Sequence, residues 1–379
     1  MADYTDSFSA PPSKRRRIFL QSHALPLIPG LPDHIAQLCL SLIHPSVLFS
    51  VCHSWRRLIY SPSFPPFLSL YAVLTCKAYS DSIHFYSFDP ISSHWRTLPP
   101  PSPDPPLRIL LRHPSFLSRN LPIQSISVSG KLVLLAATAH NFYPALTRPL
   151  IFNPLRRDWN VGPSLPTPRR WCALGAARGS IYVASGIGTQ FSIDVARSLE
   201  KWDLNGKPGD IWEKKMGLKD GRFSRDAIDA VGWRGKICMV NVKGNAAKEG
   251  IMYDVENNEW NDMPEGMLSG WRGPVAAMDE EVMYVVDEAK SALRKYNAEN
   301  DVWEELVQSE RLKGAEQLAA HGGRICVVSA GGTGISVVDV VSSPARIWAV
   351  DLPAGFEAVA VHILPRMPIP ELPETSDQD

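Results

Sequence analysis

The apolar positions of residues 25–66 follow the spacing of α-helices. After Leu31-Pro32-Asp33, apolar side chains recur every three or four residues up to Leu42, and Pro32 lies where a first helical turn tolerates it. His44-Pro45 interrupts this pattern, because the residue before a proline is disfavoured in a helix. A second segment then carries a wide apolar stripe, formed by Leu48, Val51, Cys52, Trp55, Leu58 and Ile59. We expect two helices that are too short for an independent core, so their apolar faces must pack on the rest of the chain or on a partner.

From residue 67 onward the pattern changes to short apolar runs that recur together with tryptophan. Each unit has an apolar run, a polar gap, a strand-like stretch with Asp or Asn, a turn, and then a Trp. The units end at Trp95, Trp159, Trp212, Trp260, Trp303 and, in a degenerate form, Trp348. Their separations of 64, 53, 48, 43 and 45 residues bracket the period of roughly 40–50 residues that is typical of a four-stranded propeller blade.

A second landmark stays in phase with these tryptophans. A turn with Gly or an acidic residue precedes an apolar strand at Leu132, Ile181, Ile237, Val282 and Ile325. From Trp159 onward, the distance from each Trp to the next such strand is 22, 25, 22 and 22 residues. The distance from Trp95 to Leu132 is 37 residues, and the surplus lies in the proline-rich stretch 99–122, which predicts an expanded surface loop. Two landmarks in phase indicate a repeated fold, in which each Trp fills the gap between neighbouring blades.

The two ends of the repeated region predict how the ring closes. After Trp348 the spacing calls for the first strand of another blade, and residues 355–364 have that character, but no second strand follows. The body begins instead with an unpaired second strand at residues 67–76. Joining the two completes one blade from both termini and leaves no sheet edge open, which gives six blades in a mainly β fold.

Composition narrows the class of protein. Lys and Arg (39) balance Asp and Glu (39), so no overall field attracts nucleic acid or an anionic membrane. The six cysteines are scattered without a C-x-x-C pair, which favours reduced, buried thiols over a zinc site or a disulfide framework. There is neither the long apolar region of a signal peptide nor a membrane span. Residues 1–24 and 365–379 are polar and predict disordered tails; Lys14-Arg15-Arg16-Arg17 is either a nuclear-import signal or part of a solvated tail.

The helical segment resembles the F-box of plant F-box/kelch-repeat proteins, which opens with Leu-Pro-Asp and closes with a helix of the form Cys-x-x-Trp-Arg-x-Leu. The repeated unit resembles the kelch repeat, although the double glycine of that repeat remains only at Gly331-Gly332 and in part at Ser185-Gly186. The resemblance implies an F-box over residues 25–66, a kelch-type six-bladed propeller over residues 67–364, and docking of the F-box on a Skp1-type adaptor. The matching docking residues are Leu31, Pro32, Ile35, Cys39, Leu40, Val51, Cys52, Trp55 and Leu58.

The sequence offers little that indicates catalysis. It has no G-x-S-x-G elbow and no phosphate-binding loop, and Gly186-Ile187-Gly188 lacks the third glycine of a dinucleotide fingerprint. The histidines of the repeated region occur singly, without ligand spacing. We therefore expect no catalytic centre, no cofactor and no metal, although a propeller enzyme with a convergent cluster at the channel mouth remains an alternative.

The register of the repeat places a set of polar and aromatic residues where the innermost strands begin. Arg and Trp at such a rim are typical of protein interfaces, and they are equally suited to structural packing between blades. Both interpretations stay open for these residues: Arg169, Arg170, Trp171, Arg225, Asp226, Trp271, Arg272, Glu316 and Gln317.

These features predict a non-catalytic adaptor of a Skp1–cullin–F-box (SCF) ubiquitin ligase. The F-box would bind a Skp1-like protein and through it a cullin, and the propeller would hold an unknown target protein for ubiquitination. The alternative is a propeller scaffold outside any ligase, with a helical head that packs on the ring. We expect nuclear or cytoplasmic localisation, and neither nucleic acid nor membrane as a partner.

Overall fold

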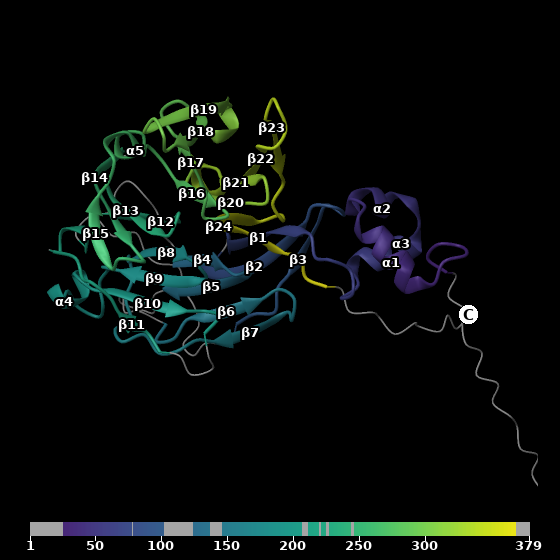
Figure 1. The fold of residues 1–379 in the computed structure, drawn as a ribbon, viewed down its shortest axis with the longest axis horizontal. Helices are drawn as coiled ribbons and strands as arrows, with labels where there is room; N and C mark the ends of the chain where they lie inside the picture. Colours follow the sequence, from purple (N-terminus) through teal and green to yellow (C-terminus); the bar gives the residue numbers. More distant parts are fainter. Residues whose placement is uncertain are drawn as a thin grey trace, which may run out of the picture. The chain divides into compact units, whose positions relative to one another are not determined.

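The computed structural model describes residues 26–77, 79–101, 124–136, 146–206, 211–219, 221–224, 227–243 and 246–368. The predicted tail 1–24, most of the proline-rich loop, and both Arg225 and Asp226 lie outside these ranges. The predicted tail 365–379 begins too early: Pro365 belongs to the last strand, and Arg366 and Met367 are buried, with the backbone of Arg366 donating to the carbonyl of Phe67 at 2.8 Å. The rest of that tail, from residue 369, lies outside the described ranges. The chain divides into two compact units, a helical unit that ends at Ile59 and a β unit that begins at Tyr60 (Figure 1).

The helical unit has three helices where the sequence predicts two. These are α1 (Asp33–Ser41), α2 (Pro45–Val51) and α3 (His53–Tyr60). Pro32 is the N-cap of α1 and so lies just before the first turn, and His44 is the N-cap of α2, which begins at Pro45. The predicted second helix is interrupted at Cys52, whose backbone is extended (φ −156°, ψ 167°). The sequence has neither proline nor glycine at this break. The apolar pattern therefore continues across it, and the sequence does not predict it.

The β unit consists of six four-stranded antiparallel sheets, the blades of a propeller. In order from the innermost strand outward, blade 1 is β24 (Phe356–Pro365), β1 (Leu68–Cys76), β2 (Tyr79–Asp89) and β3 (His94–Thr97). Blade 2 is β4 (Gln124–Val128), β5 (Lys131–Ala136), β6 (Leu150–Asn153) and β7 (Asp158–Val161). Blade 3 is β8 (Ala173–Ala177), β9 (Ser180–Ala184), β10 (Leu199–Asp203) and β11 (Glu213–Lys214).

The remaining three blades repeat this order. Blade 4 is β12 (Ala227–Trp233), β13 (Lys236–Lys243), β14 (Ala246–Asp254) and β15 (Glu259–Asp262). Blade 5 is β16 (Val275–Met278), β17 (Val282–Asp287), β18 (Ala292–Asn297) and β19 (Val302–Gln308). Blade 6 is β20 (Gln317–His321), β21 (Arg324–Val328), β22 (Ile335–Asp339) and β23 (Arg346–Val350). Short helices lie in the loops, among them α4 (Ile193–Ala196) and α5 (Glu265–Ser269).

The ring closes through blade 1, which combines the predicted strands at residues 355–364 and 67–76 from the two ends of the repeated region. β24, from the end of the chain, pairs antiparallel with β1 over a register that runs from Leu68↔Pro365 to Cys76↔Phe356. The six innermost strands contact one another in the order β24, β4, β8, β12, β16, β20, and β20 returns to β24 (Figure 1). The prediction of a six-bladed propeller is thereby confirmed.

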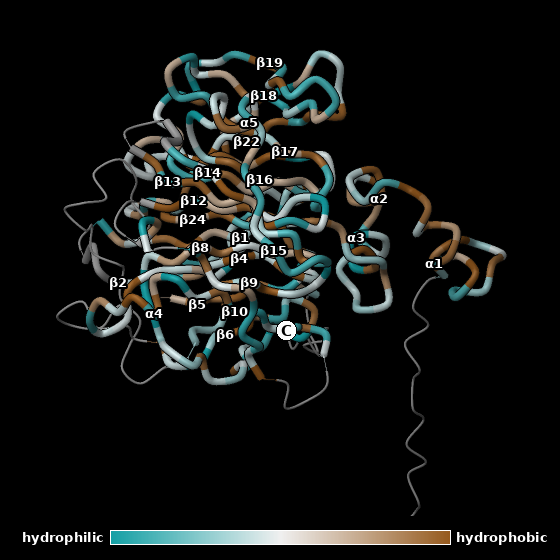
Figure 2. The backbone as a smooth tube through the Cα atoms, turned by 60° about the vertical axis from the view of Figure 1, so that its left-hand side comes forward, coloured by the Kyte–Doolittle hydropathy of each residue, from teal (hydrophilic) through white to brown (hydrophobic). Residues whose placement is uncertain are grey.

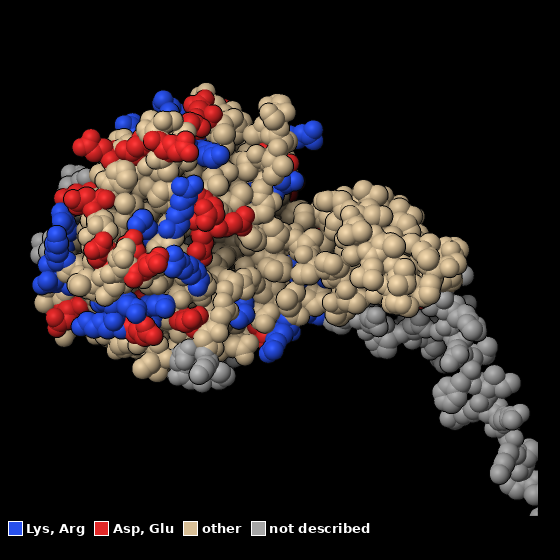
Figure 3. Space-filling model, viewed as in Figure 1, with Lys and Arg blue, Asp and Glu red and all other residues tan. Residues whose placement is uncertain are grey.

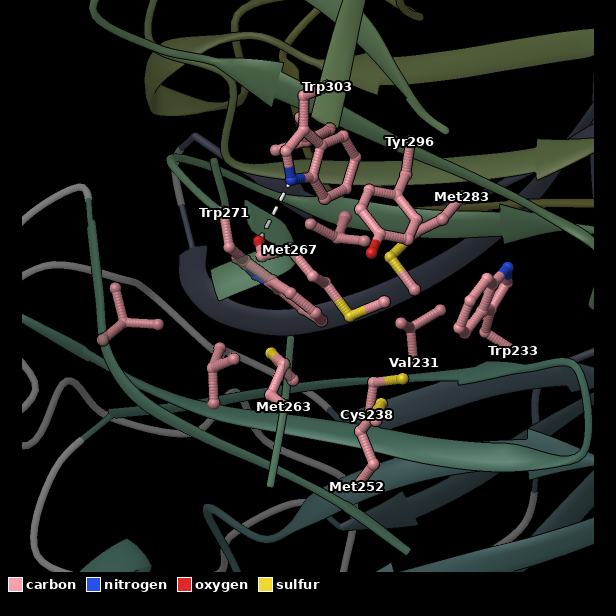
Figure 4. Close-up of a cluster of buried hydrophobic side chains, with 14 residues drawn as sticks. Val231, Trp233, Cys238, Met252, Met263, Met267, Trp271, Met283, Tyr296 and Trp303 are labelled. Atoms are coloured by element: carbon pink, nitrogen blue, oxygen red, sulfur yellow. Dashed lines mark hydrogen bonds between the residues drawn. The ribbon is translucent and has the colours of Figure 1, made fainter. Parts of the chain in front are cut away.

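Apolar cores between the blades hold the ring together. The second strands β5, β9 and β17 are buried along almost their whole length, because both faces of a blade touch neighbouring blades. The core between blades 4 and 5 contains Trp271, Met267, Tyr296 and Trp303 with a set of valines and methionines (Figure 4). The colouring of Figure 2 shows the same concentration of hydrophobic residues along the inner strands.

The hairpins that end in Trp carry a second, polar link between blades. The indole nitrogens of five of these tryptophans donate to a backbone carbonyl in the segment before their own blade: Trp95 to Asp351, Trp159 to Pro99, Trp212 to Pro163, Trp260 to Met216 and Trp303 to Met267. Trp348, in the degenerate repeat, is 41% exposed and has no such bond within the described chain. The tryptophans therefore form a belt around the ring that is interrupted at blade 6.

Candidate interaction sites

The helical unit exposes an unusual amount of apolar surface. Leu42 is 88% exposed and Leu38 65%, and Leu31, Ile35, Ile43, Val47 and Val51 are exposed as well. On the face visible in Figure 3, this unit shows neither acidic nor basic side chains. Exposed apolar residues that lie together mark interaction surfaces, because their hydration is unfavourable.

Interior contacts fix the shape of this unit. The indole of Trp55 donates to the carbonyl of Leu27 at 2.8 Å, and Arg56 Nε donates to the carbonyl of Phe49 at 2.5 Å. Leu40 and Leu58 are buried. Of the nine predicted docking residues, these two therefore lie in the interior and Trp55 is half-buried. The other six are exposed: Leu31, Pro32, Ile35, Cys39, Val51 and Cys52.

Four exposed apolar residues of the same unit were not among the predicted docking positions, namely Leu38, Leu42, Ile43 and Val47. Leu38 and Leu42 belong to the apolar periodicity of α1, and that periodicity alone does not show which of its residues are buried and which are exposed. Their exposure, together with that of the predicted positions, defines the apolar face of the helical unit.

The second candidate site is the central channel of the propeller, a cavity of about 540 Å³. We call the end at which the innermost strands begin the top rim and the end at which they finish the bottom rim. The walls are formed by residues of the six innermost strands, among them Ser125, Asp229, Ala276, Gln317 and His362.

Arg169, predicted at the top rim, is buried inside blade 3. It donates to Glu200 Oε2 at 2.8 Å, to the hydroxyl of Ser198 at 2.5 Å and to the carbonyl of Ser185 at 3.3 Å. Both side chains of the Arg169–Glu200 pair are almost completely buried. These contacts favour the structural interpretation of Arg169.

The neighbouring predicted residues are also largely interior. The guanidinium of Arg170 lies 4.5 Å from the centre of the Trp171 ring and donates to the carbonyl of Gly188. Burial lowers the pKa of Arg170 from its ordinary value. Trp271 is buried between blades 4 and 5, where its indole donates to Asp229 Oδ2 at 3.1 Å. Trp171 and Trp271 thus act as packing residues in this structure.

The remaining predicted residues of the top rim differ in exposure. Arg272 and Glu316 are exposed; Arg272 Nε donates to the carbonyl of Ser269, and Glu316 accepts from the backbone of Gly331 at 2.8 Å. Gln317 is half-buried, and its amide exchanges two hydrogen bonds with the backbone of Val361, at 2.8 and 3.2 Å. Gln317 thereby joins blade 6 to the innermost strand of blade 1.

His362 was not among the residues selected from the sequence, yet it joins the innermost strands of blades 1 and 2. Its two ring nitrogens lie 2.9 Å from the hydroxyls of Ser125 and Ser127. Burial lowers the pKa of His362 to about 4, so the imidazole is neutral near pH 7 and donates one of the bonds while accepting the other. A single histidine in a strand carries no signal of such a role, because its partners are distant in the sequence.

Neither site shows a metal centre. Among the residues that the structure describes, no three His, Cys, Asp or Glu side chains lie close enough to hold an ion. No helix in the described ranges is long and apolar enough to cross a membrane.

Comparison with known proteins agrees with the fold. No family model matches the chain. The chain is 52% identical over 381 residues to the F-box/kelch-repeat protein SKIP25 of Arabidopsis thaliana, a match that covers 97% of this chain and 96% of the relative. It is 25% identical over 283 residues to the F-box protein AFR of the same plant, covering 69% of each chain.

A small helical unit joined to a six-bladed propeller defines the class of F-box proteins that carry kelch repeats. On the extent and identity of the first match, the chain belongs to the F-box/kelch-repeat family.

Proposed function

We propose that this protein is the substrate-recognition subunit of an SCF-type ubiquitin ligase. In this function, the apolar face of the helical unit binds a Skp1-like adaptor and through it a cullin. The propeller holds the target protein. The chain itself performs no chemistry and supplies proximity and orientation to the transfer catalysed by its partners.

The observation that carries the proposal is the exposure of so many large apolar side chains on so small a unit. Leu38, Leu42 and Val51 are each more than half exposed, which is costly unless a partner covers them. Membership of the F-box/kelch-repeat family supports a Skp1-like partner. A propeller scaffold without a ligase partner is less well supported, because it leaves this apolar face unexplained.

A pull-down of the purified chain with a Skp1-type adaptor tests the proposal. Wild type is compared with a Leu31→Ala/Pro32→Ala double variant and with Leu38→Asp, which places a charge on the apolar face. Both variants are expected to lose adaptor binding, and neither alters a buried position. Val341→Asp is the matched control, because Val341 is a similarly exposed apolar residue of the propeller. Failure of the folded wild-type chain to bind any Skp1-type adaptor would refute the proposal.

The complex is proposed to act in the nucleus or the cytoplasm. The basic run Lys14-Arg15-Arg16-Arg17 and the free cysteines of the described chain support these reducing compartments. Imaging of the full chain and of a variant with this run replaced by alanine tests whether the run directs nuclear import.

A further inference from the structure

A groove open to solvent lies between β3 of blade 1 and the turn that joins β6 to β7 in blade 2. Its lining combines Pro99 and Pro100, which follow β3, with residues of that turn. Pro368, the last described residue, also belongs to the lining. Arg366 and Met367 just before it are buried, so the chain leaves the propeller from a fixed point inside this groove.

The turn between β6 and β7 presents two arginines to the groove. Arg156 and Arg157 line it and are exposed, as is Leu155, at 53%. Asn153 holds the turn: its side chain accepts from the backbone of Leu155 at 3.1 Å, and its carbonyl accepts from the backbone of Arg157 at 2.8 Å. Among the residues that the structure describes, no carboxylate pairs with either guanidinium. The groove therefore has two positive charges on a firmly held turn and no described ion-pair partner for them.

The shape of this turn does not account for Arg157, which lies just before the outermost strand of its blade. The same position in blades 1, 4 and 5 holds Ser93, Asn258 and Asp301, and all four residues have a positive φ, between 52° and 60°. Short polar side chains are favoured in this left-handed backbone because they hydrogen-bond locally, and arginine lacks that advantage. An arginine at this position therefore indicates that its charge serves an interaction outside the turn.

The segment that starts in the groove carries the opposite charge. Residues 369–379 include four acidic side chains and neither lysine nor arginine. The first of them, Glu371, follows Pro368 so closely that their backbones stay within about 10 Å of each other even in a fully extended chain. The short tether also raises the effective concentration of the segment at the groove to roughly the millimolar range. Pairing with the turn thus costs less entropy than the binding of a separate acidic peptide.

The prolines of this segment favour a conformation that suits the groove. Pro370 and Pro373 promote a polyproline II helix, which has about three residues per turn. In that conformation Glu371 and Glu374 project from one side, about 9 Å apart along the axis, and Leu372 projects from another. The segment can therefore present carboxylates to the two arginines and an apolar side chain to the apolar part of the turn.

We propose that residues 369–379 fold back into this groove, where the glutamates of the segment pair with Arg156 and Arg157 and its leucine packs on Leu155. Exposed ion pairs are individually weak, so docking depends on both pairs together and on the tether. The docked segment joins the end of β24, the strand that closes the ring, to blade 2. An acidic segment of another protein must displace it to use the same groove. This contact goes beyond adaptor docking and does not depend on it.

The test is amide NMR of the full chain labelled with nitrogen-15, with the relaxation of the Leu372 and Thr375 amides as the readout. In the wild-type chain these amides should relax at the rate of the propeller. Arg156→Glu/Arg157→Glu reverses both charges of the turn and should lower the ratio of docked to free segment at least about fivefold. Arg346→Glu reverses the charge of an exposed arginine of β23, so it is the matched control and should leave the segment docked. Salt at about 1 M should release the wild-type segment, because it screens exposed ion pairs.

Exchange of the charges tests whether the pairing is direct. Glu371→Lys/Glu374→Lys should release the segment as the arginine variant does, and a chain with all four substitutions should dock again. A segment that is free in the wild-type chain, or held equally in the wild-type chain and the arginine variant, overturns the proposal. So does docking that is lost on dilution, which assigns the groove to the segment of a second copy. Since no adaptor is present in this assay, its failure leaves the proposed ligase function to be judged by the pull-down alone.

Discussion

Arg169 and Glu200 form an ion pair of 2.8 Å inside blade 3, with both side chains almost completely removed from solvent. Removing one partner of such a pair leaves the other charge buried without compensation. We expect Glu200→Ala to lower the free energy of unfolding by about 3–5 kcal/mol, measured by urea denaturation. Glu256→Ala removes a partner from the exposed Arg178–Glu256 pair and should cost no more than about 1 kcal/mol. Equal losses for the two variants would contradict this assignment.

The pH dependence of stability should reveal His362. Its pKa is about 4 in the folded chain and about 6.5 in an unfolded one. Above pH 6.5 both states are neutral at this residue, and stability is unaffected. As the pH falls from 6.5 towards 4, only the unfolded state gains the proton, and folding weakens by up to about 3 kcal/mol.

Denaturation series at pH 7, 5.5 and 4.5 measure this loss. His362→Asn, which does not titrate, should be less stable at pH 7 because it alters the contacts with Ser125 and Ser127. It should also show a shallower decline towards acid. An unchanged slope in this variant would assign the acid sensitivity to other groups.

The tryptophan belt predicts unequal effects of the same substitution at two repeats. Trp303→Phe removes the donor to the carbonyl of Met267 from a buried site and should cost about 1–3 kcal/mol. Trp348→Phe, at the exposed and unbonded position of blade 6, should change stability by less than about 0.5 kcal/mol. Thermal and urea unfolding of the two variants, side by side, measure the difference. A larger loss at Trp348 would show that the interblade hydrogen bonds of the indoles do not account for the stability that these tryptophans contribute.

The cysteines predict a footprint of the proposed adaptor. Burial raises the pKa of Cys172, Cys238 and Cys326 to about 12, so these thiols should react with a maleimide only after unfolding. Cys39 and Cys52 are exposed on the helical unit and should react in the native chain. Addition of a Skp1-type adaptor should slow labelling of these two thiols, measured by mass spectrometry. Half-buried Cys76 of the propeller serves as the internal control, and equal protection of all three would point to a general effect on folding.

Several features of the helical unit were readable in the sequence and others were not. The proline positions correctly predict where α1 and α2 begin, because proline restricts the backbone locally. The break between α2 and α3 at Cys52 depends on how the helices pack, and no residue near it in the sequence predicts it. Burial of Leu40 and Leu58 beside exposed Leu38 and Leu42 is likewise a property of packing, since all four fit the same apolar periodicity.

For the propeller, the sequence by itself determined the repeat, the number of blades and the closure of the ring by β24 and β1. Periodic tryptophans and apolar strands are local signals, and a phase maintained over four repeats leaves little freedom in how they stack. The interiors of the blades and the channel were decided only by tertiary structure. The side chains of Arg169, Trp171 and Trp271 are buried within or between the blades. His362 and Asp229 lie on the channel wall. Their partners stand in other blades or strands, and closing the ring is what brings those groups within hydrogen-bonding distance.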